Sequence, residues 1–531
     1  MAFLREEPSM RSDDQHDKYR IVEVLTISGL LVVLLFVWQG NEGFSLWDEG
    51  FLWYGVQRVL LGEVPIRDFM AYDPGRYYWS AILLSATGDN GIMALRVVVA
   101  IFQFLGLFVG LFLVAQSATL KRRSETLFLC IAAMTLAVWM VPRHKLFDIS
   151  LSIFLIGILT FLVTKKVPLR YFIAGVCTGL VAVFGRNHGI YGLVGSLGVI
   201  VWCNIRNTSG PRLIAGLSLW AAGVAVGFTP ILLMALFVPG FALAFWASVR
   251  FLFEQQATNL PVPVPWPWTV DFAALPFPDA LNGLLLGTFF LAVPIFGVVS
   301  IFWVVRQKLK DRTVPPALVA AAFLSIPYAH YAFSRADAGH LAQGIFPMLV
   351  GSFVWMSRSG PGVKWSLVAV LFATSLSTMH ASHPGWYCYS TKQCVDVQIS
   401  GSTLEVDPAT AADVALLRRL ATTFAPSGQT FIAAPFWPGA YALLGRKSPV
   451  WEIYPLFHRS ESFEKEEIAR IRAAKPAFAV ILDTPLDNRE DLRFKNTHPF
   501  TYQYIQRNFV PAPGSPNLVY QIFKSRASES E

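Results

Sequence analysis

The sequence has few charged residues. Asp, Glu, Lys and Arg make up 15% of its 531 residues, whereas a soluble globular protein carries about 25%. Hydrophobic residues make up 54%, and the chain contains 42 Phe and 16 Trp. A water-soluble fold could not bury that much apolar surface, so the composition predicts an integral membrane protein. The same composition excludes a disordered chain, a fibrous repeat and a small disulfide-built scaffold.

Several common chemical motifs are missing as well. The chain has no P-loop, no Gly-rich dinucleotide fingerprint, no His-Glu-x-x-His and no Gly-x-Ser-x-Gly. Nucleotide-driven pumping by this chain is therefore not expected. The 43 Lys and Arg exceed the 35 Asp and Glu by 8. In a membrane protein such an excess is typical of cytoplasmic loops, so we expect no nucleic-acid partner.

Cysteine is sparse, with five in the chain. Cys130, Cys177 and Cys203 lie in apolar stretches and are expected to be packing residues. Cys388 and Cys394 lie close together in a polar segment, and they are expected to form a disulfide if that segment lies outside the cytosol. A zinc site there would need distant ligands. We therefore expect no cofactor, although a divalent metal stays open.

About eleven apolar runs are predicted to be transmembrane helices. They lie at 21–38, 92–116, 125–141, 149–163, 171–184, 189–204, 212–238, 282–304, 315–331, 341–357 and 365–379. Residues 1–20 are polar and are predicted to be a cytosolic tail. Residues 74–87 are apolar but short for a full crossing, so we expect a re-entrant or interfacial helix there. The sequence leaves open whether 74–87 spans the membrane.

Basic clusters support this set of crossings. With the tail in the cytosol, every even-numbered turn also faces the cytosol, and each is basic, as at 121–123 and 306–312. The opposite face receives a first outer loop at 39–90 and the segment 381–531. We therefore expect an α-helical polytopic membrane domain over 21–380.

The last segment, 381–531, contains no run long enough to span. Helices are predicted at 407–423 and 464–474, and strands at 429–434, 477–483 and 518–523. This alternation predicts a small C-terminal α/β extracytoplasmic domain.

An acid pair follows the first predicted span. Asp48 and Glu49 come directly after Trp47. A carboxylate at the membrane surface can accept a proton from an incoming hydroxyl, so both are candidate catalytic residues. The alternative is that Asp48 caps a helix that begins at Glu49, where the helix dipole favours an acid.

A second cluster surrounds the Asp73-Pro74-Gly75 turn. Arg76 follows this turn and could bind a phosphate, helped by the N–H groups of a helix start, with Tyr77 beside it. The alternative is an aromatic belt at the membrane surface with an anchoring arginine.

Further cations are dispersed along the predicted outer face. They are Arg143, Arg186, His188, Arg335 and His340. The positive-inside rule does not account for basic residues on this face. Together they would suit an anionic headgroup such as a lipid phosphate. Each alone is more often a snorkelling or salt-bridged side chain.

The chain resembles the GT-C superfamily of membrane glycosyltransferases. Specifically, it resembles the bacterial branch related to protein O-mannosyltransferases, the lipid A aminoarabinose transferase and the Rgt-like lipopolysaccharide galacturonosyltransferases. The residues that carry the resemblance are Asp48-Glu49, the Gly62-Glu63-Val64-Pro65 stretch and the turn before Tyr77-Tyr78-Trp79. Arg143 with Asp148, and Gly175 through Gly189, fit later parts of the pattern. The specific part covers roughly positions 44–80.

The resemblance implies a sugar donor linked to polyprenyl phosphate and an acceptor that is a glycolipid, a polysaccharide or a protein. It implies that Asp48 is the general base, that inversion occurs at the anomeric carbon, and that Arg76, Arg186, His188 and Arg335 are candidates to stabilise the leaving phosphate. It also implies a bacterial inner membrane location with a cytosolic N-terminus and a periplasmic C-terminal domain. Several relatives have Lys-Pro-Pro where this chain has Asp73-Pro74-Gly75, so the phosphate-binding lysine of those relatives is absent.

Two other functions remain open from the residues. A lipid-linked saccharide transporter or flippase would place ionisable groups near the middle of the bilayer on several helices. The predicted helix centres are nearly devoid of charge, which favours a site near the surface instead. A non-catalytic membrane scaffold that presents the C-terminal domain is the third interpretation.

Overall fold

The computed structural model describes residues 10–117, 122–206, 210–255, 259–513, 515 and 519–526. The chain divides into two compact units. The first unit contains residues 1–38, 99–232 and 255–383, and the second contains 39–98, 233–254 and 384–531. The first predicted outer loop thus belongs to the same compact unit as the C-terminal segment.

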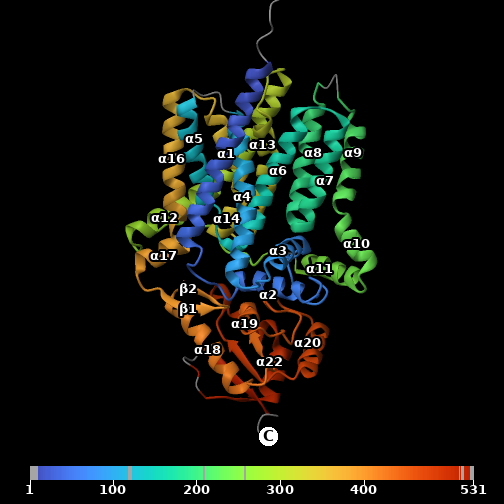
Figure 1. Ribbon diagram of the computed structural model, residues 1–531, viewed down its shortest axis with the longest axis vertical. Helices are drawn as coiled ribbons and strands as arrows, with labels where there is room; N and C mark the ends of the chain where they lie inside the picture. The colour runs from blue at the N-terminus through green and yellow to red at the C-terminus, as the bar shows by residue number, and fades with distance from the viewer. Residues whose placement is uncertain are drawn as a thin grey trace, which may run out of the picture. The chain divides into compact units, whose positions relative to one another are not determined.

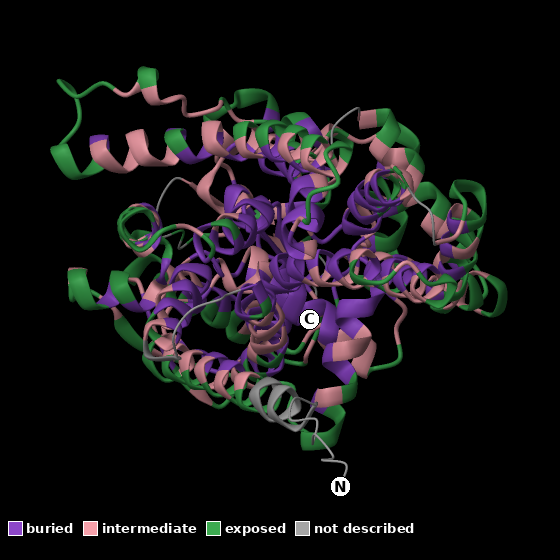
Figure 2. Ribbon diagram, turned by 90° about the horizontal axis from the view of Figure 1, so that it is seen from above, coloured by how far each residue is buried: buried purple, intermediate pink, exposed green. Residues whose placement is uncertain are grey.

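Long apolar helices form the first unit, with α4 and α10 each shared between the two units. Figure 1 shows several of them, among them α6, α7 and α8, running side by side. The helices are α1 (Met10–Gln39), α4 (Ile92–Ser117), α5 (Arg122–Val138), α6 (Leu146–Thr164), α7 (Pro168–Phe184), α8 (Arg186–Asn204), α9 (Leu213–Gly227), α10 (Thr229–Phe237), α12 (Phe277–Leu309), α13 (Pro316–Ser334), α14 (Ala338–Gly344), α15 (Phe346–Met356) and α16 (Pro361–Met379). Buried segments lie inside the bundle and exposed ones at its edge (Figure 2). Many exposed side chains of these helices are large and hydrophobic, such as Val33, Ile295 and Phe302, and exposed apolar side chains suit contact with lipid.

Small residues allow α7 and α9 to approach closely. A Cβ added at Gly175 would lie 2.1 Å from the carbonyl oxygen of Trp220, and one added at Gly223 would lie 2.1 Å from that of Phe172. Glycines four residues apart on each helix, continued by Gly179 and Gly227, therefore form the contact surface. This is the packing that Gly-x-x-x-Gly patterns produce between membrane helices.

Every predicted spanning run is helical, but the runs differ in length and continuity. Six helices are long and apolar enough to cross a membrane, or seven if α9 and α10, bent by 50° at their junction, form one span. These counts cover the described residues, and the predicted total of eleven stays a prediction. The predicted run 341–357 is two helices, α14 and α15. Helix α1 begins at Met10, inside the predicted tail, whose residues 1–9 lie outside the described part of the chain.

The second unit combines the first loop with the C-terminal segment. Its helices are α2 (Asp48–Leu60), α3 (Pro74–Thr87), α11 (Phe241–Gln255), α17 (Pro384–Thr391), α18 (Pro408–Phe424), α19 (Pro438–Leu444), α20 (Glu461–Ala474), α21 (Phe494–Thr497) and α22 (Pro499–Asn508). Helix α18 begins as the sequence predicts, because the Asp407 carboxylate accepts hydrogen bonds from the N–H groups of Ala409 and Thr410.

Two sheets complete this unit. Strands β1 (Val395–Ile399) and β2 (Ser402–Val406) form an antiparallel hairpin. The other sheet has the order β3-β4-β6-β5, in which β3 (Ile432–Ala434) is parallel to β4 (Phe478–Leu482) and the remaining pairs are antiparallel. Strands β5 (Phe509–Pro511) and β6 (Tyr520–Ser525) close it. The expected C-terminal α/β fold is therefore present, and the sequence had not predicted β5 or the hairpin.

Helix α2 packs directly on α19. Gly50 and Gly439 meet backbone to backbone, because a Cβ added at Gly50 would lie 2.4 Å from the Cα of Gly439. The N–H of Gly439 donates to the carbonyl of Leu46 at 2.9 Å, and the N–H of Ser448 donates to the Tyr54 hydroxyl at 2.9 Å. These contacts hold the acid pair at the start of α2 against the C-terminal segment.

Candidate active site

Asp48 is the first residue of α2. Its backbone N–H donates to the Ser45 hydroxyl at 3.2 Å, so Ser45 supports the helix start and Asp48 lies within the first turn. The hydroxyl of Tyr454 donates to Oδ1 of Asp48 at 3.4 Å. The ring of Trp47 stacks on that of Phe436, with centroids 4.6 Å apart. One aromatic side chain of the C-terminal segment thus contacts the expected base, and another stacks on the residue before it.

Glu49 lies in a different environment. Arg96, on the first turns of α4, donates from Nε to Oε1 and from Nη2 to Oε2 of Glu49, each at 2.8 Å. The same guanidinium donates to the carbonyls of Gly40 at 2.8 Å and Gly43 at 2.6 Å. Such a bidentate pair neutralises the Glu49 carboxylate. The geometry therefore favours a structural role for Glu49 over the catalytic role expected from the sequence.

A pocket of about 220 Å³ adjoins Asp48. Its lining is Phe44, Ser45, Leu46, Trp47, Asp48, Thr410 and Asp413. The Tyr520 hydroxyl donates to the Asp413 carboxylate. Burial raises the pKa of Asp413, and the charge of Asp407 acts in the same direction. The described residues that line the pocket include two carboxylates and no cation, which suits a ligand that donates hydrogen bonds and disfavours a phosphate.

Arg76 and Tyr77 lie at the start of α3, as predicted. Arg76 is buried, and its Cζ lies 4.6 Å from the centre of the Tyr72 ring. The Tyr77 hydroxyl accepts a hydrogen bond from the N–H of Tyr72 at 3.0 Å, and the Tyr77 ring packs tightly against Gly55. Tyr77 therefore holds the turn before α3 against α2.

In the first unit, His188 connects three helices. Its Nδ1 lies 2.7 Å from the Tyr328 hydroxyl, and its Nε2 lies 3.1 Å from Oδ1 of Asp148. His188 is buried, and both ring nitrogens have polar partners, as expected for a polar group inside an apolar bundle. Arg143 and Arg186 are half-buried, the former in a single 3-10 turn before α6 and the latter as the first residue of α8.

Arg335 and His340 share one carboxylate. Arg335 Nε donates to Oδ2 of Asp337 at 2.8 Å, and His340 Nδ1 lies 2.9 Å from Oδ1. Burial acts against ionisation of Asp337, but the hydrogen bonds from His340 and the nearby charges outweigh it and lower the pKa of Asp337 to about 2. Part of the positive charge expected here is thus compensated within the cluster.

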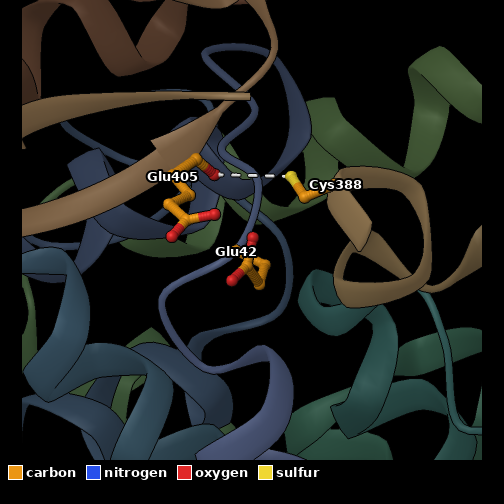
Figure 3. Close-up of side chains that lie close together, drawn as sticks. All are labelled: Glu42, Cys388 and Glu405. Atoms are coloured by element: carbon orange, nitrogen blue, oxygen red, sulfur yellow. Dashed lines mark hydrogen bonds between the residues drawn. The ribbon is translucent and has the colours of Figure 1, made fainter. Parts of the chain in front are cut away.

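Glu42, Cys388 and Glu405 gather near the β1–β2 hairpin (Figure 3). Their potential ligand atoms lie within 4.8 Å of one another, which no other group of three such residues in the described ranges does. Cys388 forms a disulfide with Cys394, however, so its sulfur is not a thiolate. The two carboxylates could offer oxygen ligands alone, the kind that a hard divalent cation takes.

The predicted site residues thus fall into two sets, and each set lies within one unit. Asp48, Glu49, Arg76 and Tyr77 belong to the second unit, and Arg143, Arg186, His188, Arg335 and His340 to the first. Sequence reasoning missed Arg96, Tyr454 and Tyr328. The sequence does single out Arg96, because a charged residue inside a predicted membrane span is costly and is usually kept for a role. Nothing in the sequence singles out Tyr454, because only the fold brings it close to Asp48.

Comparison with known proteins agrees with this architecture. The crystal structure of ArnT from Cupriavidus metallidurans in the apo state is similar over 95% of this chain and 98% of that chain, with a TM-score of 0.57 and 13% identity. The chain has the fold of ArnT. ArnT bound to undecaprenyl phosphate matches with a TM-score of 0.56, the same identity and the same coverage. The fold class expected from the sequence, a domain of long apolar helices followed by a C-terminal α/β domain, is therefore confirmed.

A more distant match is the Archaeoglobus fulgidus oligosaccharyltransferase tethered with an acceptor peptide. It has a TM-score of 0.46 and 13% identity, over 96% of this chain and 74% of that chain. No family model and no curated protein matches the sequence. At this identity the likeness to ArnT is one of fold.

Proposed function

We propose that this chain is a membrane glycosyltransferase that transfers a sugar from a polyprenyl-phosphate donor to an acceptor hydroxyl. The fold of ArnT, which has been crystallised with undecaprenyl phosphate, supports this donor class. The observation that carries the proposal is the contrast within the acid pair. Arg96 neutralises Glu49, whereas Asp48 lines a pocket beside Tyr454.

Asp48 acts as the general base. Its carboxylate accepts the proton of the acceptor hydroxyl while the acceptor oxygen attacks the anomeric carbon from the face opposite the phosphate. The bond between the anomeric carbon and the phosphate oxygen breaks, the configuration inverts, and polyprenyl phosphate leaves as an anion. Arg76, Arg143, Arg186 and Arg335 are the candidates to stabilise this anion, with His188, His340 and Tyr77 as further polar groups.

The enzyme resides in the bacterial inner membrane, with its N-terminus in the cytosol and residues 381–531 in the periplasm. The basic even-numbered turns support this orientation. The acceptor is a glycolipid, a polysaccharide or a protein. No cation is among the residues described around the Asp48 pocket, which favours an acceptor portion that presents hydroxyl groups rather than phosphate.

The buried Asp148–His188–Tyr328 cluster is the observation that favours a transporter. Its position argues against one, however. Asp148 and His188 are each the third residue of their helices, α6 and α8. A transporter would place such groups near the middle of the bilayer. Ionisable residues near helix ends suit a site at the membrane surface.

The test compares envelope glycolipids and glycans from a deletion strain with those of its parent by mass spectrometry. Wild-type protein should restore a sugar that the deletion removes, and Asp48→Asn should fail to restore it at equal expression. The matched control is Asp396→Asn, an exposed acid on β1, which should restore it fully. Full restoration by Asp48→Asn would show that Asp48 is not the general base. An unchanged glycan profile in the deletion strain would show that the protein is not the proposed transferase.

A further inference from the structure

Helix α17 (Pro384–Thr391) turns aromatic side chains outward. Trp386, Tyr387 and Tyr389 expose 44%, 43% and 73% of their surface, whereas Cys388 is buried on the opposite face. The rings of Trp386 and Tyr389 lie 6.2 Å apart. Each ring has an apolar body and a polar edge, a combination that favours an environment with both apolar and wet regions.

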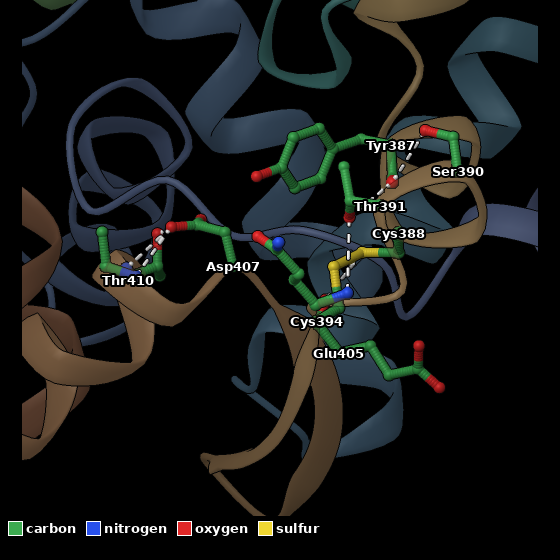
Figure 4. The surroundings of a disulfide bond; sticks show 10 residues. Tyr387, Cys388, Ser390, Thr391, Cys394, Glu405, Asp407 and Thr410 are labelled. Carbon is green, nitrogen blue, oxygen red and sulfur yellow. Dashed lines mark hydrogen bonds between the residues drawn. A yellow bond between two sulfur atoms is a disulfide. The ribbon is translucent and has the colours of Figure 1, made fainter.

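The inner face of α17 is fixed to the second unit. Cys388 and Cys394 form a disulfide that joins the helix to the residue before β1 (Figure 4). Between them Lys392 has a left-handed φ of 53°, which turns the chain back toward the hairpin. The Cys388 sulfur also lies 4.0 Å from the Glu405 carbonyl on β2. The helix is thus held against the hairpin by covalent and packing contacts.

The chain connects α17 closely to a candidate membrane span. The candidate span that contains α16 runs from Pro361 to Ser382. Trp386 follows Ser382 by four residues, which reach at most about 14 Å even when fully extended. The headgroup region on each side of a bilayer core is about 5–8 Å thick. An exposed aromatic face tethered this closely to the end of a span lies within reach of that region.

We propose that α17 is a membrane-interface anchor whose aromatic face inserts among the headgroups of a phospholipid bilayer, and that the Cys388–Cys394 disulfide holds this face outward. Tyrosine and tryptophan are the residues that concentrate at both membrane–water interfaces. A short helix without a covalent clamp would not keep its orientation, because isolated helices of this length are unstable in water. The proposal does not depend on glycosyl transfer.

The experiment uses the full-length protein in phosphatidylcholine nanodiscs. The emission of Trp386 is obtained as the difference between wild type and Trp386→Phe, so that the other tryptophans cancel. Phosphatidylcholine brominated near the headgroup should quench this difference emission more strongly than lipid brominated near the chain end. Trp451→Phe provides the matched control, because the Trp451 indole donates to the Ile66 carbonyl inside the unit. Its difference emission should be unaffected by either lipid.

Three outcomes would overturn the anchor. If aqueous iodide quenches the Trp386 emission and brominated lipid does not, the aromatic face lies in water. Emission protected from both quenchers would mean that a second copy or another protein covers it. Stronger quenching by the deeply brominated lipid would mean burial in the hydrocarbon core. Tyr389→Trp in the Trp386→Phe background supplies a second reporter, expected to follow the same shallow pattern.

The role of the Cys388–Cys394 disulfide can be tested separately. Cys388→Ser with Cys394→Ser should reduce the lipid quenching of Trp386, because the helix would no longer hold one face outward. Cys130→Ala, which removes a cysteine outside the disulfide, should leave the quenching unchanged. Undiminished quenching in the double serine variant would overturn the role of the disulfide while leaving the aromatic anchor in place.

Discussion

Arg96 binds Glu49 through two parallel hydrogen bonds of 2.8 Å, and both side chains are buried. The same guanidinium holds the carbonyls of Gly40 and Gly43, so a single side chain joins α4 to the loop before α2 and to its first turn. Because Glu49 directly follows Asp48, this ion pair orients the backbone that carries the proposed base.

Arg96→Met should destabilise the protein by about 3–5 kcal/mol, because it leaves the Glu49 carboxylate buried without a counter-charge. Thermal unfolding of the detergent-solubilised protein measures the loss. Adding Glu49→Leu to Arg96→Met should recover much of it, since the double variant buries no uncompensated charge. A double variant as unstable as Arg96→Met alone would contradict the pairing.

Glu49→Gln should retain measurable transfer, whereas Asp48→Asn should lose it by about 10²- to 10⁴-fold, the usual contribution of a general base. The reason is that the Glu49 carboxylate contacts Arg96, while Asp48 lines the pocket. Glycan profiling of the complemented deletion strain measures both variants. An equal loss of sugar transfer in the two variants would indicate that Glu49 is catalytic as well.

Gly50→Val should weaken the contact between α2 and α19, because its side chain would meet the backbone of Gly439. Overpacking of this kind costs about 1–3 kcal/mol. Transfer should fall as well, since the first turn of α2 would move. Gly362→Ala is the control: Gly362 also lies near a helix start, but nothing lies within 4 Å of an added Cβ. Its unfolding temperature should not decrease.

Tyr328→Phe should cost about 1–3 kcal/mol, because it leaves a buried nitrogen of His188 without its hydroxyl partner. Tyr191→Phe should cost less, since the Tyr191 hydroxyl lies 3.3 Å from His330 in a half-buried contact. Thermal unfolding of the two variants, measured side by side, checks the order. A larger effect for Tyr191 would show that the His188 cluster is not the more stabilising one.

The C-terminal segment should lose stability in acid through Glu452. Burial acts against ionisation of this carboxyl, but the hydrogen bond from His498 and the charge of Arg459 lower its pKa below the ordinary value of 4.5. A lowered pKa stabilises the fold above about pH 4.5 and loses that contribution as the pH falls further. In Glu452→Gln, unfolding temperatures should show a smaller decrease between pH 5 and pH 3. An equal decrease in both proteins would exclude Glu452 as the source.

Local patterns were enough to predict most of the elements. Apolar runs determine where helices form in a membrane, because an unpaired backbone N–H or C=O is costly in lipid. Asp407-Pro408 marked the start of α18 for an equally local reason, a side chain that caps its own helix. The short strand β5 escaped prediction, because three residues carry little periodicity and pair only through β6.

The sequence by itself determined that this is a polytopic membrane protein, that an acid pair follows its first span, and that a small α/β domain ends the chain. Composition and hydrophobic periodicity are properties of neighbouring residues, so they can be read without a fold. Only the tertiary structure decided how the two acids differ. Arg96 lies 47 residues after Glu49, and Tyr454 lies 406 residues after Asp48. Packing of the first loop on the C-terminal segment, with the backbone contact of Gly50 and Gly439, brings Tyr454 to Asp48, and the start of α4 brings Arg96 to Glu49.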